Sequence, residues 1–439
     1  MGLATFKRGI HPDDGKAMSK DAPIKKLLPK GELVFPMSQH IGAPSKPIVN
    51  VGDRVLVGQK IADSTGFISS VIVSSVSGTV KAIEDRMTVS GGKVSSIVIE
   101  NDDKYETVEG FGTDRDYTKL SKDEIRNIVK EAGIVGMGGA GFPTFVKLTP
   151  KDDDSIEHII INGAECEPYL TSDYRNMIEE PELLIGGIKV MLQLFSKAKA
   201  LIGIEVNKMD AIELLRDLVK DEDRIEVVPL KVKYPQGAER QLIYATTGKK
   251  INSSMLPADA GCIVNNVEST IAIYLAVCKN TPLVRRIITV TGDAVNTPCN
   301  FEVRLGTNAR ELIEAAGGFK SKPEKVISGG PMMGVAMYSL DIPITKIASA
   351  LLCMTVDQVA LNETTACIRC GRCIDACPSG LIPQKLLEYA ENFDDEGFMG
   401  IDGMECYECG CCTYVCPARR RLTQAFKQTR RSILNNRKK

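Results

Sequence analysis

A cysteine pattern that occurs twice near the C-terminal end constrains this chain more than any other feature. The first copy is Cys367-x2-Cys370-x2-Cys373-x3-Cys377, and the second repeats this spacing over Cys406, Cys409, Cys412 and Cys416; a proline follows each copy. Three thiolates spaced in this way can wrap a loop around one cubane, while the fourth, before the proline, points elsewhere. Zinc sites use two pairs of ligands instead. The pattern therefore predicts two [4Fe-4S] clusters, and with them electron transfer.

The ligands of each cluster are expected to come from both copies of the pattern. In bacterial two-cluster ferredoxins the fourth cysteine ligates the other cluster. We therefore expect one cluster on Cys367, Cys370, Cys373 and Cys416, and the other on Cys406, Cys409, Cys412 and Cys377. The remaining cysteines lack ligand spacing, so Cys411 is expected to be a buried thiol and Cys262, Cys278, Cys299 and Cys353 are expected to be core residues.

Composition excludes several classes of protein. With 439 residues, of which 43% are hydrophobic, the chain is too long for one core. It has 55 Lys and Arg against 56 Asp and Glu, so its overall charge gives no reason to expect nucleic acid binding.

We found neither a secretory signal nor an apolar stretch long enough to span a bilayer, and we expect a cytoplasmic location. Residues 419–439 contain nine Lys or Arg and no acid; this tail is either simply solvated or contacts anionic lipid or an acidic partner.

Residues 1–115 are expected to form β structure. Valines alternate over 49–57 around the turn at Gly52, and residues 71–83 look like a second strand, turn and strand around Gly78. Paired halves of this kind are similar to the barrel-sandwich fold of biotinyl and lipoyl carriers. A carrier needs a displayed lysine, and residues 62–77 contain none. A structural or docking module is therefore the better interpretation.

Residues 116–283 alternate between helical and strand patterns. Ser121 and Glu124 predict a capping box, and Gly133 is expected to end that helix. Strands are expected at 158–161, 200–206 and 225–230, with a helix over 211–219. Repeating units of this kind imply a largely parallel sheet, which binds ligands at the carboxyl ends of its strands. Asn162 lies at such an end.

Two further domains are expected after residue 283. A smaller α+β domain over 284–350 has predicted strands at 287–291, 299–305 and 325–328 and a helix at 308–316. The last domain, 355–439, holds the cysteine patterns and ends in the basic tail.

A glycine-rich loop precedes the first expected strand of the parallel sheet. It contains Gly136, Gly138, Gly139 and Gly141, with Lys147 just beyond. Exposed amides in such a loop can approach a phosphate or a ring closely. The loop matches neither the Walker A motif nor a Rossmann fingerprint, and the alternative is a turn-rich connection.

Together with two later segments, this loop resembles the flavoprotein subunit of respiratory complex I. That resemblance implies an FMN loop at Gly136, Gly138 and Gly139, with Lys147 at the phosphate. It implies an acidic segment facing flavin and nicotinamide at Asn162, Glu165, Cys166 and Glu167, and a flavin contact at Asn265 and Asn266. Cys166 stands where that family usually has serine. Residues 234–241 match its nicotinamide-facing segment only in part, so Glu239 is either a nicotinamide contact or an exposed glutamate at a helix start.

Over its full length the chain resembles the RnfC family. The resemblance is carried by residues 5–12, 38–44 and 234–239 and by the paired cysteine patterns. It implies a multidomain α/β fold: an N-terminal β barrel-sandwich hybrid, a complex I-like FMN/NADH domain, a β-grasp (SLBB) domain and a mostly α, ferredoxin-like domain with two [4Fe-4S] clusters. RnfC proteins are subunits of the Rnf ion-translocating ferredoxin:NAD oxidoreductase.

The resemblance also implies an activity and a place in the cell. The chain would exchange hydride between NADH and FMN and pass single electrons through its clusters, to or from membrane-bound and ferredoxin-like Rnf subunits and indirectly ferredoxin. It would sit peripherally on the cytoplasmic side of the cell membrane. Two alternatives stay open: a stand-alone RnfC-like reductase, such as a cobalamin reductase or a proline-reductase-associated protein, and a ferredoxin-type relay without enzymatic activity.

Overall fold

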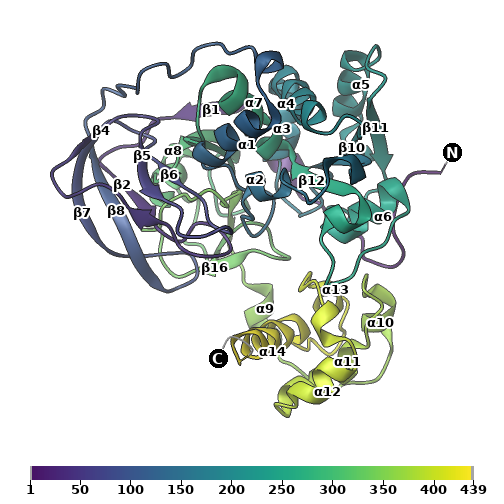
Figure 1. Ribbon diagram of the computed structural model, residues 1–439. Helices are drawn as coiled ribbons and strands as arrows, with labels where there is room; N and C mark the ends of the chain where they lie inside the picture. Colours follow the sequence, from purple (N-terminus) through teal and green to yellow (C-terminus); the bar gives the residue numbers. More distant parts are fainter. Residues whose placement is uncertain (1, 437–439) are drawn as a thin grey trace.

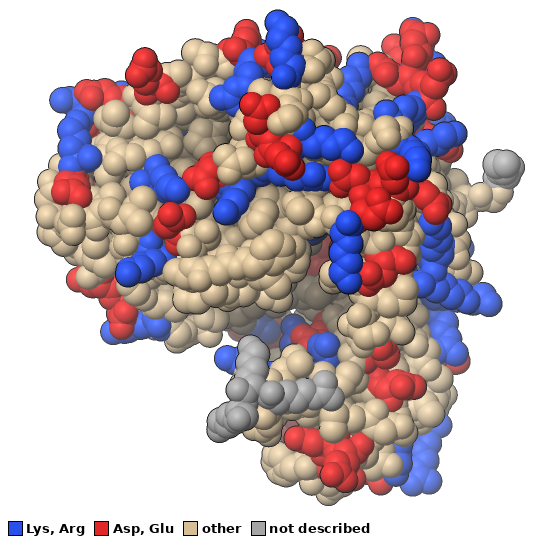
Figure 2. Space-filling model, in the orientation of Figure 1, with Lys and Arg blue, Asp and Glu red and all other residues tan. Residues whose placement is uncertain are grey.

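The computed structural model describes residues 2–436, which form four β-sheets and a separate group of C-terminal helices (Figure 1). The sheets and the helices that cover them make up one large body. The C-terminal helices form a smaller lobe on one side of that body, beside α6 and β16 in the view of Figure 1. Figure 2 shows a hollow between the body and part of this lobe, with acidic and basic side chains interspersed over the body.

Two antiparallel sheets form most of the region before residue 105. One contains β2 (Glu32–Pro36), β8 (Lys93–Asn101), β7 (Gly78–Met87) and β4 (Arg54–Val55) in that order, and the other contains β3 (Lys46–Pro47), β5 (Lys60–Asp63) and β6 (Ile72–Val73).

The strands expected within residues 71–83 are present as β6 and β7, but the expected turn at Gly78 is wrong, since Gly78 is the first residue of β7 and the two strands lie in different sheets. The serines that connect them are buried, and two of the three bond away from the connection. Ser75 Oγ donates to Leu305 O over 2.6 Å and Ser77 Oγ donates to Asp102 Oδ1 over 2.6 Å. These bonds satisfy the hydroxyls without a tight turn. Of the alternating valines at 49–57, only Val55 lies in a strand.

A four-stranded, entirely parallel sheet follows. Its order is β11 (Ile225–Leu230), β10 (Lys199–Glu205), β9 (His158–Gly163) and β12 (Cys262–Asn266). The sequence predicts a largely parallel sheet and three of its strands, and β12 is the strand that it did not predict. The unbroken apolar run at 159–161 is typical of a strand buried on both faces, and all three isoleucines are fully buried. The register pairs Asn162 with Asn266, so the carboxyl ends of β9 and β12 lie side by side.

Seven helices belong to this part of the described chain: α1 (Lys122–Glu131), α2 (Thr144–Lys147), α3 (Ser172–Glu179), α4 (Pro181–Leu194), α5 (Met209–Leu218), α6 (Glu239–Thr247) and α7 (Val267–Lys279). The predicted capping box is present, because Ser121 accepts from the amide of Glu124 while the Glu124 carboxylate accepts from the amide of Ser121. Gly133 follows the helix with a φ of 70°. Both signals are local, and both are confirmed.

A six-stranded mixed sheet draws on two distant parts of the chain. It runs β1 (Ile24–Leu27), β14 (Cys299–Arg304), β13 (Arg285–Thr291), β17 (Ala350–Met354), β15 (Lys325–Ser328) and β16 (Val335–Met337), with α8 (Ala309–Ala315) after β14. The first strand comes from the N-terminal segment and pairs in parallel with β14. Earlier in that segment, Ala4 pairs with Leu230 and Ile10 pairs with Tyr234. The N-terminal segment thus links this sheet to the parallel one, and the domain bounds 1–115, 116–283, 284–350 and 355–439 stay predictions.

The C-terminal lobe contains five helices of four to nine residues and one of 15 residues, which surround a small core of its own. They are α9 (Gln358–Leu361), α10 (Arg372–Ala376), α11 (Pro383–Glu391), α12 (Asp395–Gly400), α13 (Cys411–Tyr414) and α14 (Leu422–Asn436). Leu386, Phe398 and Phe426 are buried at its centre. Among the described residues, none of the helices combines the length and the apolar character needed to cross a bilayer.

Candidate functional site

The glycine-rich loop lies against the start of α7. The amide of Met137 donates to Ser269 Oγ over 2.9 Å, and the amide of Gly136 donates to Phe142 O over 2.9 Å. A side chain at Gly138 would come within 3.1 Å of Asn266 Nδ2. The loop and Asn266 are therefore in close contact, and glycine at position 138 permits that approach.

Lys147, the last residue of α2, extends its side chain to the glycine-rich loop. Its Nζ donates to Val264 O in β12 over 2.9 Å, and a Cβ on Gly136 would lie 3.4 Å from this Nζ. Burial lowers the pKa of Lys147, and the nearby charge of Glu239 opposes that shift. An ammonium group thus lies beside the backbone of the glycine loop.

The two asparagines at the end of β12 have different surroundings. Asn266 caps α7, since its Oδ1 accepts from the amide of Glu268 over 2.9 Å, and its Nδ2 donates to Asp173 Oδ2 over 2.7 Å. Asn265 is fully buried, and its Nδ2 lies 3.0 Å from the sulfur of Met191 in α4. Its Oδ1 has no hydrogen-bond partner among the described residues. Of the two, Asn266 is the one that the structure brings to the glycine loop.

The segment 162–168 follows β9 and is tied to the segment before α6. Asn162 Nδ2 donates to Gly237 O over 2.8 Å, and the amide of Gly237 donates to the sulfur of Cys166 over 3.2 Å. Burial raises the pKa of the Cys166 thiol to about 12. Glu239, the first residue of α6, is exposed.

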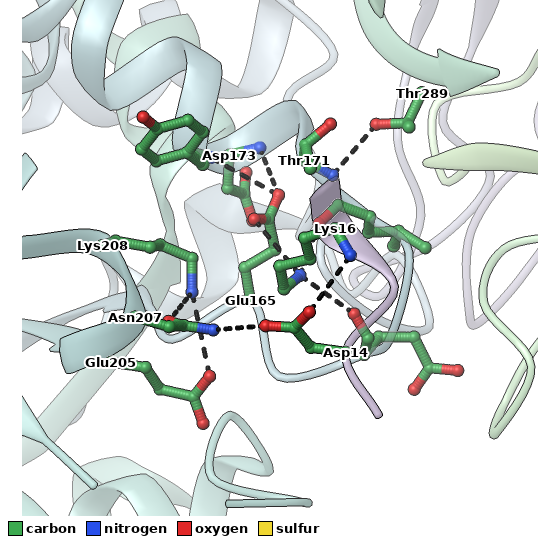
Figure 3. A network of polar contacts seen from close by, with 12 residues as sticks. Asp14, Lys16, Glu165, Thr171, Asp173, Glu205, Asn207, Lys208 and Thr289 are labelled. Carbon is green, nitrogen blue, oxygen red and sulfur yellow. Dashed lines mark hydrogen bonds and ion pairs between the residues drawn. The ribbon is translucent and has the colours of Figure 1, made fainter. Parts of the chain in front are cut away.

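Glu165 is held in a buried network of charged side chains (Figure 3). Its Oε1 accepts from the amide of Asp173 over 2.7 Å, and its Oε2 lies 3.5 Å from Lys16 Nζ. Lys16 also donates to Leu170 O over 2.5 Å and to Glu167 O over 3.1 Å. Glu165 has a φ of 44°, a backbone conformation that needs support from its surroundings. Lys16, in the N-terminal segment, supplies that support.

The same network contains further acids and a second lysine. Lys208 Nζ donates to Ala164 O over 2.8 Å and lies 3.8 Å from Glu205 Oε2. Burial, together with the charges of Glu165 and Glu268, raises the pKa of Asp173 to about 7. Burial also raises the pKa of Glu167, whose Oε1 accepts from the amides of Met332 and Met333. No local pattern singles out Lys16, Lys208 or Asp173, because each of them contacts groups in other elements.

The eight cysteines of the duplicated pattern surround two separate cavities in the lobe. One cavity is lined by Cys367, Cys370, Cys373 and Cys416, here called the Cys367 set. The other is lined by Cys377, Cys406, Cys409 and Cys412, here called the Cys377 set, and Cys411 also reaches it. Within residues 2–436, no three His, Cys, Asp or Glu side chains are arranged to hold a single metal ion. The cysteines surround spaces instead of converging on one point.

Apart from the half-buried Cys166, the cysteines outside the two sets are buried, as the sequence predicts. Cys411 is fully buried, and its thiol points at Tyr234 O, 3.9 Å away. Cys262, Cys278, Cys299 and Cys353 are all core residues.

Comparison with known proteins gives each part of this chain a counterpart. Family models match the RnfC barrel-sandwich hybrid domain at residues 4–104, the Nuo51 FMN-binding domain at 129–275, the SLBB domain at 287–336 and the 4Fe-4S dicluster domain at 366–419. The C subunit of a Na(+)-translocating ferredoxin:NAD(+) oxidoreductase complex from Acetobacterium woodii is 42% identical over 99% of this chain and 98% of its own length. The chain belongs to the RnfC family.

A second relative agrees with this assignment, and one solved structure shares the fold. The C subunit of a proton-translocating ferredoxin:NAD(+) oxidoreductase complex from Clostridium ljungdahlii is 47% identical over 88% of this RnfC chain and 84% of its own length. A NAD+-reducing [NiFe]-hydrogenase in the H2-reduced state shares the fold, with a TM-score of 0.50 and 17% identity over 73% of this chain and 62% of that one. The expected fold class, domain order, FMN-binding domain and two-cluster domain are confirmed.

Proposed function

We propose that this RnfC chain is the electron-transfer subunit of a ferredoxin:NAD oxidoreductase complex, in which it exchanges hydride with NADH and passes electrons on singly. The observation that carries the proposal is a contact within the molecule. The loops of the Cys377 set pack against the domain that matches an FMN-binding family, and Tyr234 Oη of that domain donates to Cys409 O over 2.8 Å. One chain thus joins a two-electron site to one-electron sites. FMN, when bound, supplies the exchange between the two, because flavins handle both hydrides and single electrons.

The residues around the glycine loop fit a flavin phosphate. Gly138 has no side chain on the face of the loop that meets Asn266, and the Lys147 ammonium lies next to Gly136. Loop amides and an ammonium group are the donors that phosphates prefer. We assign Gly136, Gly138, Gly139 and Lys147 to the phosphate end of FMN, with Asn162 and Asn266 close by. Asn265, although its Oδ1 lacks a partner, faces Met191, so its contact with flavin is the weaker part of this assignment.

The nicotinamide side is assigned to the acidic segment. Glu165, Cys166 and Glu167 lie on the loop after β9, and Glu239 begins the facing helix α6. Burial keeps the Cys166 thiol protonated at neutral pH, which suits a neutral contact rather than a nucleophile. Glu239 is exposed and can reach a ligand without desolvation.

The two cysteine sets fit two [4Fe-4S] clusters. Thiolates are the ligands of such clusters, and each cavity offers four of them. Each set takes three cysteines from one copy of the pattern and the fourth from the other, which is the ligand exchange expected for two-cluster ferredoxins. This grouping supports the proposed assignment.

We further propose that the chain works docked peripherally on the cytoplasmic side of the membrane, next to integral and ferredoxin-like subunits. Exposed Arg419, Arg421 and Arg431 lie near the C-terminal end, and Arg437, Lys438 and Lys439 lie outside the described residues. Each such charge contributes roughly 1 kcal/mol at an anionic surface and is screened by salt. Firm attachment must therefore come from protein contacts.

Salt washing of native membranes tests this arrangement. The chain should stay with the membranes at high ionic strength and copurify with integral subunits of the complex. If it elutes completely and never copurifies with them, the stand-alone reductase replaces the proposed function. A preparation that contains iron but no flavin would instead favour the simple relay.

A further inference from the structure

The two cysteine sets differ in what surrounds them. Cys409 and Cys411 are buried in one apolar group with Ile10 and Tyr234, and Cys166 packs at its edge. This group brings together the N-terminal segment, the nicotinamide-side loop and the lobe. The Cys377 set therefore has the flavin-binding domain directly beside it.

Several polar contacts fix this junction. Arg240 of α6 forms an ion pair with Glu405 over 2.6 Å, next to Cys406 in sequence. Gln241 donates to the hydroxyl of Tyr407 over 2.9 Å. The amide of Gly9 donates to the carbonyl of Ala376, the residue before Cys377, over 3.2 Å. Both loops that supply the Cys377 set are thus bonded to the body.

Close packing continues behind these contacts. A side chain at Gly410, between Cys409 and Cys411, would come within 3.3 Å of Met332. The amide of Met332 in turn donates to Glu167 Oε1 over 2.7 Å. A continuous series of contacts therefore leads from the loop that holds Glu165, Cys166 and Glu167 to the cysteines of this set.

The Cys367 set is partly exposed to solvent instead of packed against the body. Cys367 and Cys370 are exposed, and Ile368 between them is 68% exposed. The hydrogen bonds of its loops stay within the lobe: the amide of Thr365 donates to Ala418 O, and the thiol of Cys373 donates to Gln384 Oε1. This set faces outward.

We propose that the Cys377 set is the site at which electrons pass between the flavin-binding domain and the lobe, and that the Cys367 set is the site at which they pass out of the chain. The inference rests on the proposed function and adds the order in which the two sets are used. Electron tunnelling weakens steeply with distance and is more efficient through packed atoms than across gaps. The Cys377 set packs against the flavin-binding domain, so electrons can pass between them. Two cysteines of the Cys367 set are exposed, so a partner can approach this set.

Rapid mixing of the intact holoprotein with NADH, followed by freezing and electron paramagnetic resonance, tests the order. Cys370→Ala and Cys412→Ala each remove one cluster and assign the two signals. In the unmodified protein the signal of the Cys377 set should appear first. NADH should still reduce the Cys377 set in Cys370→Ala protein at an unchanged rate. In Cys412→Ala protein the Cys367 set should lose at least tenfold in its rate of reduction by NADH while dithionite still reduces it.

The outcomes separate this inference from the function on which it rests. If the Cys367 set is reduced first, or at the full rate in Cys412→Ala protein, the order is wrong and the function stands. If NADH reduces neither flavin nor cluster in unmodified protein, the function fails and the order fails with it.

A milder pair of variants leaves all eight ligands in place. Tyr234→Phe removes one donor beside Cys409, and hydrogen bonding around a cluster tunes its potential. It should lower the midpoint potential of the Cys377 set alone. Tyr414→Phe, on an exposed ring in α13, is the control and should shift neither potential. A shift of the Cys367 set in Tyr234→Phe protein, with none in the Cys377 set, would contradict the proposed placement.

Discussion

Burial controls the charges of the side chains around the acidic loop. Asp173 lies in the interior beside Glu165 and Glu268, and its pKa is raised to about 7. The unfolded chain ionises this carboxyl at its ordinary, lower value. Between the two values the folded protein holds a proton that the unfolded chain has released, so the free energy of unfolding falls as the pH rises toward 7.

Asp173→Asn should remove this pH dependence. An amide can still accept from Asn266 Nδ2, so the contact survives while the buried charge is lost. We expect the melting temperature of the variant to exceed that of the unmodified protein by an amount that grows from pH 5 to pH 7 and then levels off. Asp217→Asn, at an exposed position on α5, is the control and should show no such trend. A constant difference across this range would contradict the raised pKa.

Lys147→Ala should release flavin and leave the clusters in place. A hydrogen bond to a charged group contributes about 1.5–3 kcal/mol, so FMN binding should weaken roughly 10- to 100-fold. The measurement is the ratio of flavin to iron after gel filtration. Lys151→Ala, at an exposed position nearby, should behave like the unmodified protein. Unchanged flavin affinity in Lys147→Ala protein would mean that the lysine is wrongly assigned.

Sequence reasoning at the scale of single residues succeeded where the signal was local. The cysteine spacing brings three thiols of one loop to each cavity, because they lie close together in the chain. The fourth thiol of each set was expected from two-cluster ferredoxins, and the assignment of all eight to clusters stays a prediction. Sequence reasoning could not find Lys16 as a neighbour of the site or the contact of Tyr234 with Cys409, because these partners lie more than 100 residues apart. Such contacts depend on the tertiary fold and leave no pattern in the chain.

Helices and strands were also predicted correctly where the signal was local. The capping box of α1 and the apolar strand β9 were predicted from adjacent residues, and both are present. The turn expected at Gly78 was wrong, because Gly78 begins β7 and the chain passes there from one sheet to another. The place of β1 beside β14 was not predicted at all, since nothing in a four-residue strand identifies its partner.

The N-terminal segment should matter for the acidic loop. Lys16→Met removes the cation that faces Glu165 and the donor to the carbonyls of Glu167 and Leu170. Loss of one partner of a buried ion pair costs about 3–5 kcal/mol, so the variant should unfold at lower denaturant concentration and retain less flavin. Lys7→Met, at an exposed position in the same segment, should change neither property. Equal stability of the two variants would show that Lys16 does not support the loop.

Replacing a ligand cysteine in one copy of the cysteine pattern should remove one cluster and leave the other in place. Anaerobic reconstitution should give roughly eight irons per chain, and Cys406→Ala should lower this to about four. The neighbouring Cys411 is a matched control, because Cys411→Ala removes a buried thiol without removing a ligand. Iron near four in the unmodified protein, unchanged by Cys406→Ala, would contradict two clusters.

The whole molecule is arranged around the junction between body and lobe. The segment at residues 9–10, the start of α6 and the cysteine loops all meet there, although they come from the beginning, the middle and the end of the chain. Family resemblance predicted the order of the domains. The junction itself follows from side-chain packing, which no spacing in the sequence specifies.

The central claim is that one chain accepts hydride from NADH and delivers single electrons to its clusters. The most direct measurement is to purify the chain without oxygen and to follow iron, flavin and NADH-driven bleaching in the same sample. The account predicts bound FMN, roughly eight irons and bleaching of both the flavin and the iron-sulfur absorbance on addition of NADH. Clusters that dithionite reduces but NADH leaves oxidised, in a sample that retains its flavin, would contradict it.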